Sequence, residues 1–452
     1  MSIFMTWDKK PFFAGTYFPP KSHYGMPGFP DLLDVIVSQW NNNRRKLLQS
    51  AEQIITHLKS AESGDKNIDD EELIKRAMQI FSESFDEING GFSSAPKFPT
   101  PHNLLFLMLY AKHKQDSDAL KMAEKTLLQM RKGGIFDHIG YGFSRYSTDK
   151  YFLAPHFEKM LYDNALLIIA YSAAYYLTNN EIYLDTAEKT TEYILREMTS
   201  ADGGFYSAQD ADSEGVEGKY YTFTLDEIIN VLGEEKGKRF AESFDITSNG
   251  NFEGVNILNL LKSNDLESDF SEEIHKLYDY RKKRTNLHLD NKILLSWNSL
   301  MIAALSMFYR VSRNEKYLNA VVNAQKFIEE NMCDGVQLFT SWRDGKHSEK
   351  SFLDDYAFYI ASLIELYNST LDKIYLEKAE RFCDEAVRQF EDCQRDGFYL
   401  CEASYTEIFM NPKETYDGAI PSGNSVMAYN FVRMFQSVSY THLRAHETVL
   451  DL

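Results

Sequence analysis

The chain has 452 residues, of which 44% are hydrophobic and 14% aromatic. This apolar content can bury a sizeable core, so general disorder is excluded and one large domain with a smaller companion is expected. Lys and Arg total 48 against 67 Asp and Glu, giving a formal net charge of -19. A field of this sign repels phosphate backbones and anionic lipid surfaces, so neither nucleic acid nor a membrane is an expected partner.

Targeting segments, disulfides and metal clusters are not expected either. The longest apolar run, 166–177, is shorter than the roughly 20 residues that a bilayer span requires. The first residues lack the basic and apolar regions of a secretory signal, which predicts a cytoplasmic protein. The run that begins at Asp210 is similar to the start of a calcium loop, but its twelfth position is Tyr221 where a Glu is required. The cysteines form no Cys-x-x-Cys pair, so no metal and no cofactor is predicted; they are Cys333, Cys383, Cys393 and Cys401.

The N-terminal segment has the pattern of a small α/β fragment. Residues 2–18 predict two short strands joined by a polar turn at Asp8 to Lys10, and 31–58 shows the apolar spacing of one helix. Two strands and a helix cannot make a complete core, so a partial domain is expected over 1–59. The polar and charged stretch 60–72 predicts a linker.

From there to residue 436, amphipathic stretches alternate with glycine-rich loops. Helices are predicted near 73–87, 103–114, 117–131, 157–177, 182–199, 270–285, 297–312, 315–331, 354–370, 374–391 and 422–436. Similar loops recur between helices at Gly90-Gly-Phe, Gly133-Gly-Ile, Gly203-Gly-Phe and Asp396-Gly-Phe. This internal repeat predicts helical hairpins, which stack as a solenoid or close as a ring.

Two segments depart from that rhythm. Residues 204–260 are rich in turns and contain a predicted strand at Tyr220 to Thr224, so they are interpreted as an insertion, one that could lie over the mouth of a ring. Residues 437–452 fit no helical pattern and resemble translated vector sequence, so they are interpreted as a non-native tail.

Polar residues gather between Gly134 and Asn164, where a loop leads into a helix whose later part is apolar. Imidazole titrates near neutrality, so His138 and His156 are candidates for acid–base catalysis. Asp137 and Glu158 are the candidate carboxylates of this region. The candidate binding residues are Arg145, Tyr146, Tyr162 and Asn164. The alternative is that these groups only cap the helix and form surface ion pairs.

A carboxylate, an aromatic and an amide recur at the starts of three later helices. Sugars are bound in this way, by aromatic faces against C–H surfaces and by hydrogen bonds to hydroxyls. The catalytic candidates here are Asp355 and Asp417. The binding candidates are Trp297, Asn298, Tyr356, Tyr416 and Asn424. The alternative is that the aromatics belong to the core and the acids are N-caps.

Over residues 1–436 the chain resembles the spermatogenesis-associated protein 20 family. The motifs that carry the resemblance are Lys10 to Pro20, Gly90 to Pro99, Asp137 to Tyr146, Pro155 to Asn164, Gly203 to Gly215, Ser296-Trp-Asn and Tyr416 to Asn424. The resemblance implies a mainly α fold, in which a thioredoxin-like domain precedes a six-hairpin α/α toroid like that of glycosidases and sugar epimerases. It also implies that both ends are truncated, with the first half of the thioredoxin-like part and its Cys-rich segment lacking.

The leading hypothesis is a carbohydrate-active enzyme with a small-molecule substrate, a sugar. An epimerase or isomerase would use His138 and His156 as acid and base. A hydrolase would use two of Asp137, Glu158, Asp355 and Asp417, about 5 Å apart for retention or about 6.5–9.5 Å apart for inversion. One alternative is a thioredoxin-like redox or chaperone protein, although no cysteine precedes Cys333. Another is a non-catalytic sugar-binding or scaffold protein.

Overall fold

A computed structural model describes residues 1–438 except Tyr24, 61–68, 264–265, 267–268, 349 and 406–409. Most of the predicted linker at 60–72 and of the predicted tail at 437–452 therefore lies outside the described residues. The chain divides into two compact units. One comprises Met1–Asp69 with Gln389–Lys413, and the other comprises Asp70–Arg388 with Glu414–Asp451.

The first unit contains a hairpin and two helices. Strand β1 (Ser2–Met5) pairs antiparallel with β2 (Pro11–Gly15), as the alternating pattern predicts. Helix α1 (Phe29–Asn42) and helix α2 (Arg44–Ser60) follow, and α2 packs against β2. The prediction of one helix over 31–58 is wrong at Asn43, whose φ of -132° ends α1. The Asn43 backbone N–H still donates to Gln39 O at 2.7 Å, so Asn43 is the C-cap at which α1 ends.

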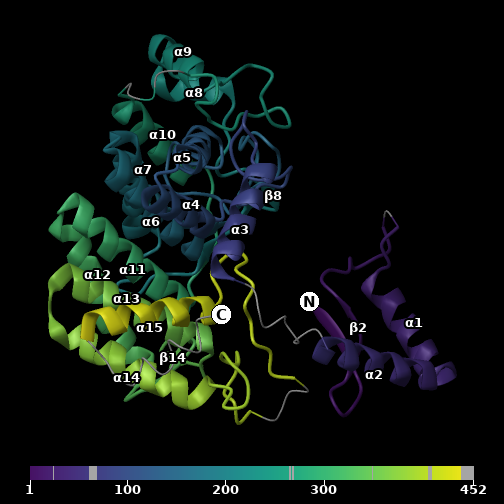
Figure 1. Ribbon diagram of the computed structural model, residues 1–452. Coiled ribbons are helices and arrows are strands. Elements are labelled where there is room, and N and C mark those ends of the chain that lie inside the picture. Colours follow the sequence, from purple (N-terminus) through teal and green to yellow (C-terminus); the bar gives the residue numbers. More distant parts are fainter. Residues whose placement is uncertain are drawn as a thin grey trace. The chain divides into compact units, whose positions relative to one another are not determined.

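Five long helices of the second unit surround a common cavity. They are α4 (Pro101–Lys114), α6 (Leu161–Thr178), α11 (Leu295–Ser312), α13 (Leu353–Thr370) and α15 (Gly423–Val438). Within this unit α4 packs against α6, α6 against α11, α11 against α13, and α13 against α15 (Figure 1). All five contribute side chains to one cavity of about 520 Å³. These are the inner helices of a ring.

A second set of helices lies outside the first. It comprises α3 (Asp70–Ser84), α5 (Ser117–Lys132), α7 (Glu181–Glu197), α12 (Glu315–Asn331) and α14 (Lys373–Phe390). Helix α5 packs against α4, α7 against α6 and α12 against α11. The alternation of outer and inner helices makes the unit an α/α toroid, which confirms the ring over the solenoid.

Burial explains which helices are inner. Helix α6 is buried around its whole circumference from Leu161 to Ser172, because neighbours cover every side of it. Helix α7 buries only one face, at Tyr183, Ala187 and Thr190, and presents charged residues on the other. A helix that is apolar all round must be enclosed, whereas an amphipathic one belongs on the surface.

Each outer helix is followed by a tight loop that precedes an inner helix. The loops are closed by the isolated bridges Phe85↔Phe92, Phe136↔Phe143, Thr199↔Phe205 and Glu391↔Phe398, and by the pairing of β11 (Cys333–Asp334) with β12 (Gln337–Leu338). The prediction was wrong about the second loop, where the repeated unit is Gly142-Phe143 and Gly133 instead ends α5. Gly142 has a φ of +76°, and a Cβ there would lie 2.4 Å from the Tyr193 ring.

The first turn of an inner helix holds the backbone of the loop before it. Asn164 accepts a hydrogen bond from Phe143 N at 2.7 Å and donates to Phe143 O at 3.0 Å. Asn298 makes the same pair with Phe205, at 2.7 Å and 2.9 Å. At the equivalent position of α13 the Tyr356 hydroxyl donates to Val336 O at 2.9 Å. These side chains therefore satisfy buried backbone groups.

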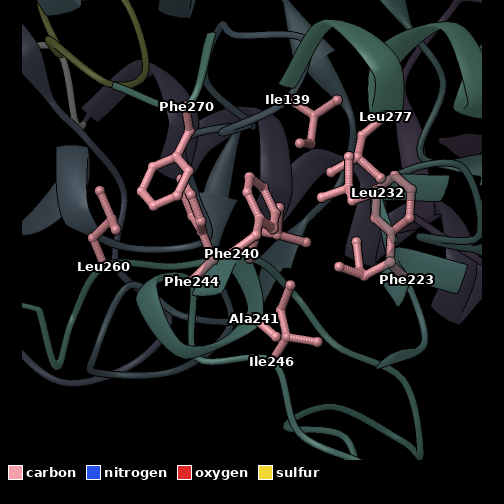
Figure 2. Close-up of a cluster of buried hydrophobic side chains, with 12 residues drawn as sticks. Ile139, Phe223, Leu232, Phe240, Ala241, Phe244, Ile246, Leu260, Phe270 and Leu277 are labelled. Carbon is pink, nitrogen blue, oxygen red and sulfur yellow. The ribbon is translucent and has the colours of Figure 1, made fainter. Parts of the chain in front are cut away.

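The insertion contains helices that the pattern did not predict. They are α8 (Leu225–Leu232) and α9 (Glu234–Ser243), and α10 (Ser271–Arg284) follows them close to its predicted range. Figure 2 shows their shared apolar cluster, in which Phe240, Phe244 and Phe270 pack together and Ile139 joins from the second loop. The predicted strand at Tyr220 to Thr224 is reduced to one bridge, Phe223↔Asn256, because Thr224 forms a capping box with Glu227 and starts α8.

Among the helices that the structure describes, none combines the length and the apolarity needed to cross a bilayer.

The loop-holding role of Asn298 is testable by stability. Asn298→Ala removes both hydrogen bonds to the buried Phe205 backbone and is expected to cost roughly 2–4 kcal/mol of unfolding free energy. Urea denaturation followed by circular dichroism measures the change in midpoint. The control is Asn319→Ala on the exposed face of α12, which should change the unfolding free energy by less than about 0.5 kcal/mol. Equal midpoints for the two variants would contradict this role.

Candidate active site

The first turns of the inner helices meet at one end of the toroid. The ring of Tyr162 on α6 lies 4.8 Å from that of Trp297 on α11, centroid to centroid. The backbone N–H of Ser296, also on α11, donates to the carboxylate of Asp355 on α13 at 3.2 Å. The backbone N–H of Gly423, the first residue of α15, donates to the Asp354 carboxyl. Four inner helices thus share one polar rim.

Two small sheets fix the backbone just before α6 and α11. One sheet orders β5 (Lys159–Met160), β6 (Ala208–Gln209) and β9 (Leu289–Asp290), and the other orders β10 (Ile293–Leu294), β13 (Ser341–Arg343) and β14 (Lys346–His347). Strand β5 runs directly into α6, and β10 runs directly into α11. The backbone that carries the rim side chains is therefore held by a sheet before it and by a packed helix after it.

His156 is a partly exposed histidine at the rim. It lies on β4 (Pro155–His156), which pairs with β3 (Tyr146–Ser147), and its ring stacks on that of Tyr146 at 5.2 Å. Its Nδ1 lies 2.7 Å from Glu217 Oε1 and its Nε2 lies 3.6 Å from Glu158 Oε2. The nearby Glu158 carboxylate raises the pKa of His156, burial opposes this, and the hydrogen bond to Glu217 adds to it. The side chain remains 28% exposed, so a ligand can reach an imidazole whose pKa is raised.

Arg145, Glu158 and Tyr162 extend this network. Arg145 Nη1 lies 3.3 Å from Glu158 Oε2, and the Arg145 backbone N–H donates to Glu158 O at 2.8 Å. The nearby His156 lowers the pKa of Glu158, so this carboxylate is ionised. Burial raises the pKa of Tyr162 to about 12, so its hydroxyl stays a hydrogen-bond donor. The cluster pairs charged groups with a neutral donor.

Asp163 adds a second carboxyl, whose pKa is shifted in the opposite direction to that of Glu158. It is 4% exposed, and its Oδ2 has no hydrogen-bond partner among the described residues. Burial raises its pKa well above the usual range, although the charge of Arg145 opposes this. A buried carboxyl with a raised pKa therefore lies one residue from Tyr162, a feature that the sequence pattern did not single out.

Asp354 and His102 are further rim groups that the sequence analysis missed. Burial, with the charge of Asp355, raises the pKa of Asp354 to about 6, and its Oδ1 has no partner among the described residues. His102, on the first turn of α4, likewise has both ring nitrogens buried without a partner in the described part of the chain. Burial lowers its pKa, against the charge of Asp417. Their position in the repeat, the first turn of an inner helix, was the available signal.

Asp137 does not belong to the rim, so its predicted catalytic role is corrected. Its carboxylate is buried between Lys159 Nζ at 2.8 Å and Arg281 Nη1 at 3.0 Å. Although burial opposes ionisation, the two cations hold the pKa of Asp137 well below its usual range. Asp86 and Asp392 occupy the same position in other loops and pair with a lysine in the same way. Asp137 is therefore part of the loop repeat.

His138 also lies away from the rim, which removes it as an acid or base. It is 4% exposed, with Nδ1 3.3 Å from Arg131 Nη1 and Nε2 3.1 Å from Gly133 O. Burial and the charge of Arg131 lower its pKa to about 3. Because the ring is buried and both of its nitrogens have partners within the protein, the structure favours a structural role for His138 over the predicted role as acid or base.

Four further candidates face the protein instead of the rim opening. Asn164, Asn298 and Tyr356 are fully buried and hold loop backbone, so their predicted contacts with a substrate are corrected. Asp355 is 2% exposed and accepts hydrogen bonds from Ser296 N, Phe352 N and the Thr340 hydroxyl. Asp355 is the N3 residue of α13, where it accepts from the N-cap Phe352 N–H, and it ties α13 to α11; it stabilises the helix start without being its N-cap.

The candidates before α15 are more open. Asp417 accepts a hydrogen bond from Ser422 N at 2.8 Å, close to the start of the helix. Tyr416 is 78% exposed. Asn424 donates to Glu414 O at 2.9 Å. The structure brings together Arg145, Tyr146, His156, Glu158, Tyr162 and Trp297, and among the contacts of the described residues none links this group to Asp417, Tyr416 or Asn424.

The described residues contain no group of three or more His, Cys, Asp or Glu side chains arranged to hold a metal ion.

Comparisons with known proteins agree with both parts of the chain. A family model described as "Protein of unknown function, DUF255", of the thioredoxin DsbH type, matches residues 1–59. Spermatogenesis-associated protein 20 of Homo sapiens is 34% identical over 96% of this chain, and that of Rattus norvegicus is 35% identical. An uncharacterized protein of Caenorhabditis elegans is 33% identical. The chain spans 62% of the human and rat relatives and 66% of the nematode one.

Solved structures share the toroid at low sequence identity. A D-mannose isomerase matches with a TM-score of 0.56 and 11% identity, over 84% of both chains. A GH76 alpha-mannanase from Bacteroides thetaiotaomicron matches with a TM-score of 0.51 and 13% identity, over 84% of this chain and 81% of its own. At such identities the likeness shows a common fold.

The structural role of Asp137 is tested by Asp137→Asn. The change leaves Lys159 and Arg281 buried without a counter-charge, and we expect the free energy of unfolding to fall by about 3–5 kcal/mol. Because the pKa of Asp137 is lowered in the fold, its contribution is present above the ordinary carboxyl pKa and is lost as the pH falls. The difference in unfolding free energy between wild type and Asp137→Asn, measured by urea denaturation, should therefore become smaller at acid pH.

The matched control is Asp202→Asn in the exposed turn of the third loop. This variant should leave the free energy of unfolding almost unchanged at every pH. An Asp137→Asn variant as stable as this control would show that the buried ion cluster does not support the fold.

Proposed function

We propose that this chain, which is similar over 96% of its length to spermatogenesis-associated protein 20 and spans 62% of the human protein, is a sugar-active enzyme. Its toroid fold is like that of a D-mannose isomerase. The ligand would lie at the rim formed by the inner-helix starts. The observation that carries the proposal is the accessible network of His156, Glu158 and Arg145 beside the aromatic pair Tyr162 and Trp297.

The charges at the rim favour an uncharged, polyhydroxylated ligand. The imidazolium of His156 and the guanidinium of Arg145 are balanced by Glu158 and Glu217. A balanced site gives no net attraction to a phosphorylated sugar but offers donors and acceptors for hydroxyl groups. The ring of Trp297, half-buried beside Tyr162, can cover the C–H face of a sugar.

Proton transfer next to a carbonyl is the chemistry that these groups support. His156, protonated and reachable, can donate a proton to a carbonyl oxygen. Glu158, ionised in the same network, can accept a proton from the neighbouring carbon. The predicted partnership of His156 with His138 is replaced by this pair, because His138 is buried and neutral.

A hydrolase is the second candidate, supported by the two carboxyl groups Glu158 and Asp163. Their environments push the two pKa values in opposite directions, which leaves one ionised base and one neutral acid. Such a pair is the requirement for glycoside cleavage. The mannanase with the same fold makes an α-mannoside the appropriate probe.

The redox alternative has less support. Burial raises the pKa of Cys333 to about 11, and burial also raises the pKa of Cys383 and of Cys401. A reactive thiol requires a lowered pKa, because the thiolate is the nucleophile.

Proton exchange tests the isomerase proposal. The full chain is incubated with D-mannose, D-glucose or D-fructose in D₂O, and loss of the proton signal next to the carbonyl carbon is followed by NMR. We expect exchange in the wild type and at least a 100-fold loss in His156→Asn, within the range for a removed general acid. His113→Gln, an exposed histidine on α4, should exchange at the wild-type rate.

Exchange that survives in His156→Asn would eliminate His156 as the acid, and no exchange by the wild type with any of the three sugars would contradict the isomerase proposal. Calorimetric binding of one of these sugars without exchange would instead favour a non-catalytic binding protein.

The hydrolase candidate has its own test with 4-nitrophenyl α-D-mannoside. Glu158→Gln and Asp163→Asn should each abolish release of nitrophenol, because either loss leaves the pair without its base or its acid. Asp202→Asn should hydrolyse at the wild-type rate. Release that persists in both single variants would eliminate this carboxyl pair.

A further inference from the structure

The insertion carries a hairpin that reaches the rim. Strand β7 (Asp212–Ser213) pairs with β8 (Val216–Glu217), so that Asp212 lies opposite Glu217. Glu214 and Gly215 form the tip, both with positive φ. The hairpin precedes α8 and lies far in the sequence from the loops around His156.

Buried contacts anchor the hairpin at its base. Ser213 is 1% exposed, and its hydroxyl lies 2.6 Å from Thr285 Oγ1 and donates to Asn286 O at 2.7 Å. On the other strand, Gly218 N donates to Ala211 O at 3.0 Å. The Gly218 backbone lies so close to Phe157 that a Cβ would be 2.5 Å from the Phe157 ring. Glu217 therefore projects from a backbone that is held on both sides.

This backbone brings Glu217 onto His156. Glu217 Oε1 lies 2.7 Å from Nδ1 of the imidazole, 61 residues away in the sequence. The other charged groups that face the imidazole are Glu158, 3.6 Å from Nε2, and Arg145, which pairs with Glu158. Tyr146 covers one ring face at 5.2 Å. Each ring nitrogen of His156 thus has a carboxylate neighbour, and one face of the ring is covered by Tyr146.

We infer that Glu217 is a positioning residue of the candidate site, held by the insertion hairpin so that it fixes the orientation of the His156 ring. The inference rests on the role proposed for His156 and adds the insertion to the site. It also gives the carboxylates of Glu217 and Glu158 different roles. Glu217 takes Nδ1 and sets the ring, which leaves the Nε2 side, with Glu158, for the ligand.

Exposure alone would make this pair a weak surface ion pair. The Glu217 side chain is 47% exposed, and such pairs contribute little when both side chains are free to move. The anchored base of the hairpin removes much of that freedom. Glu214 at the tip provides the comparison, because it pairs with Lys219 and not with His156.

Titration of His156 by NMR tests the inference without requiring a known substrate. The His156 ring signals are assigned by their loss in His156→Asn. In Glu217→Gln, which keeps the shape of the side chain and removes its charge, we expect the pKa of His156 to fall relative to wild type. Glu214→Gln, on the same hairpin, should leave the pKa of His156 unchanged.

The exchange assay uses the sugar that exchanges fastest with the wild type. As the pH is raised, Glu217→Gln should lose activity at a lower pH than the wild type, because its His156 imidazolium loses its proton at a lower pH. Glu214→Gln should keep the wild-type profile. An unchanged His156 pKa in Glu217→Gln, or an equal fall in both variants, overturns the positioning role. A fall confined to Glu217→Gln, with no exchange by any variant or wild type, supports the positioning role and rejects the proposed activity.

Discussion

The buried backbone of the loops between outer and inner helices must be hydrogen-bonded, and the rest of the structure depends on how this is done. The Asn164 and Asn298 amides and the Tyr356 hydroxyl reach back from inner helices to these loops. Asp137 closes its own loop from within and is neutralised by Lys159 and Arg281. Polar groups that are fully paired can be buried at little cost, whereas unpaired ones would open the toroid at each loop.

This constraint divides the polar residues at the inner-helix starts into two sets. Residues of the first set are buried, and their side chains hydrogen-bond to other groups of the protein, as those of Asn164 and Asp355 do. Those of the second set keep an exposed surface or an unpaired atom, as His156 and Asp163 do. The second set is therefore the one we propose for ligand binding, because a group that supports the loops cannot be released without destabilising them. The end of the toroid where the inner helices begin therefore contains both the residues that hold the loops and the residues of the candidate site.

The insertion joins these two roles. Arg281 on α10 reaches Asp137 in the second loop, and Ile139 of that loop enters the apolar cluster of the insertion (Figure 2). The insertion itself sends its hairpin to His156 through Glu217. Helix α10, which follows the insertion, thus completes the ion cluster beneath the rim, and the insertion supplies a side chain at the rim. Different insertions on one toroid could in this way equip it for different ligands.

Periodicity and glycine spacing by themselves determined most helices of the toroid and their grouping in hairpins, because these depend on residues close in sequence; they missed α8, α9 and the break at Asn43. Helix α12 lies at the predicted 315–331. Only the tertiary structure decided which polar residues are available. Asn164 meets a backbone 21 residues away and His156 meets Glu217 at a distance of 61 residues. The local sequence around an asparagine or a histidine is the same whether it faces a loop or a ligand, because burial and pairing come from distant parts of the chain.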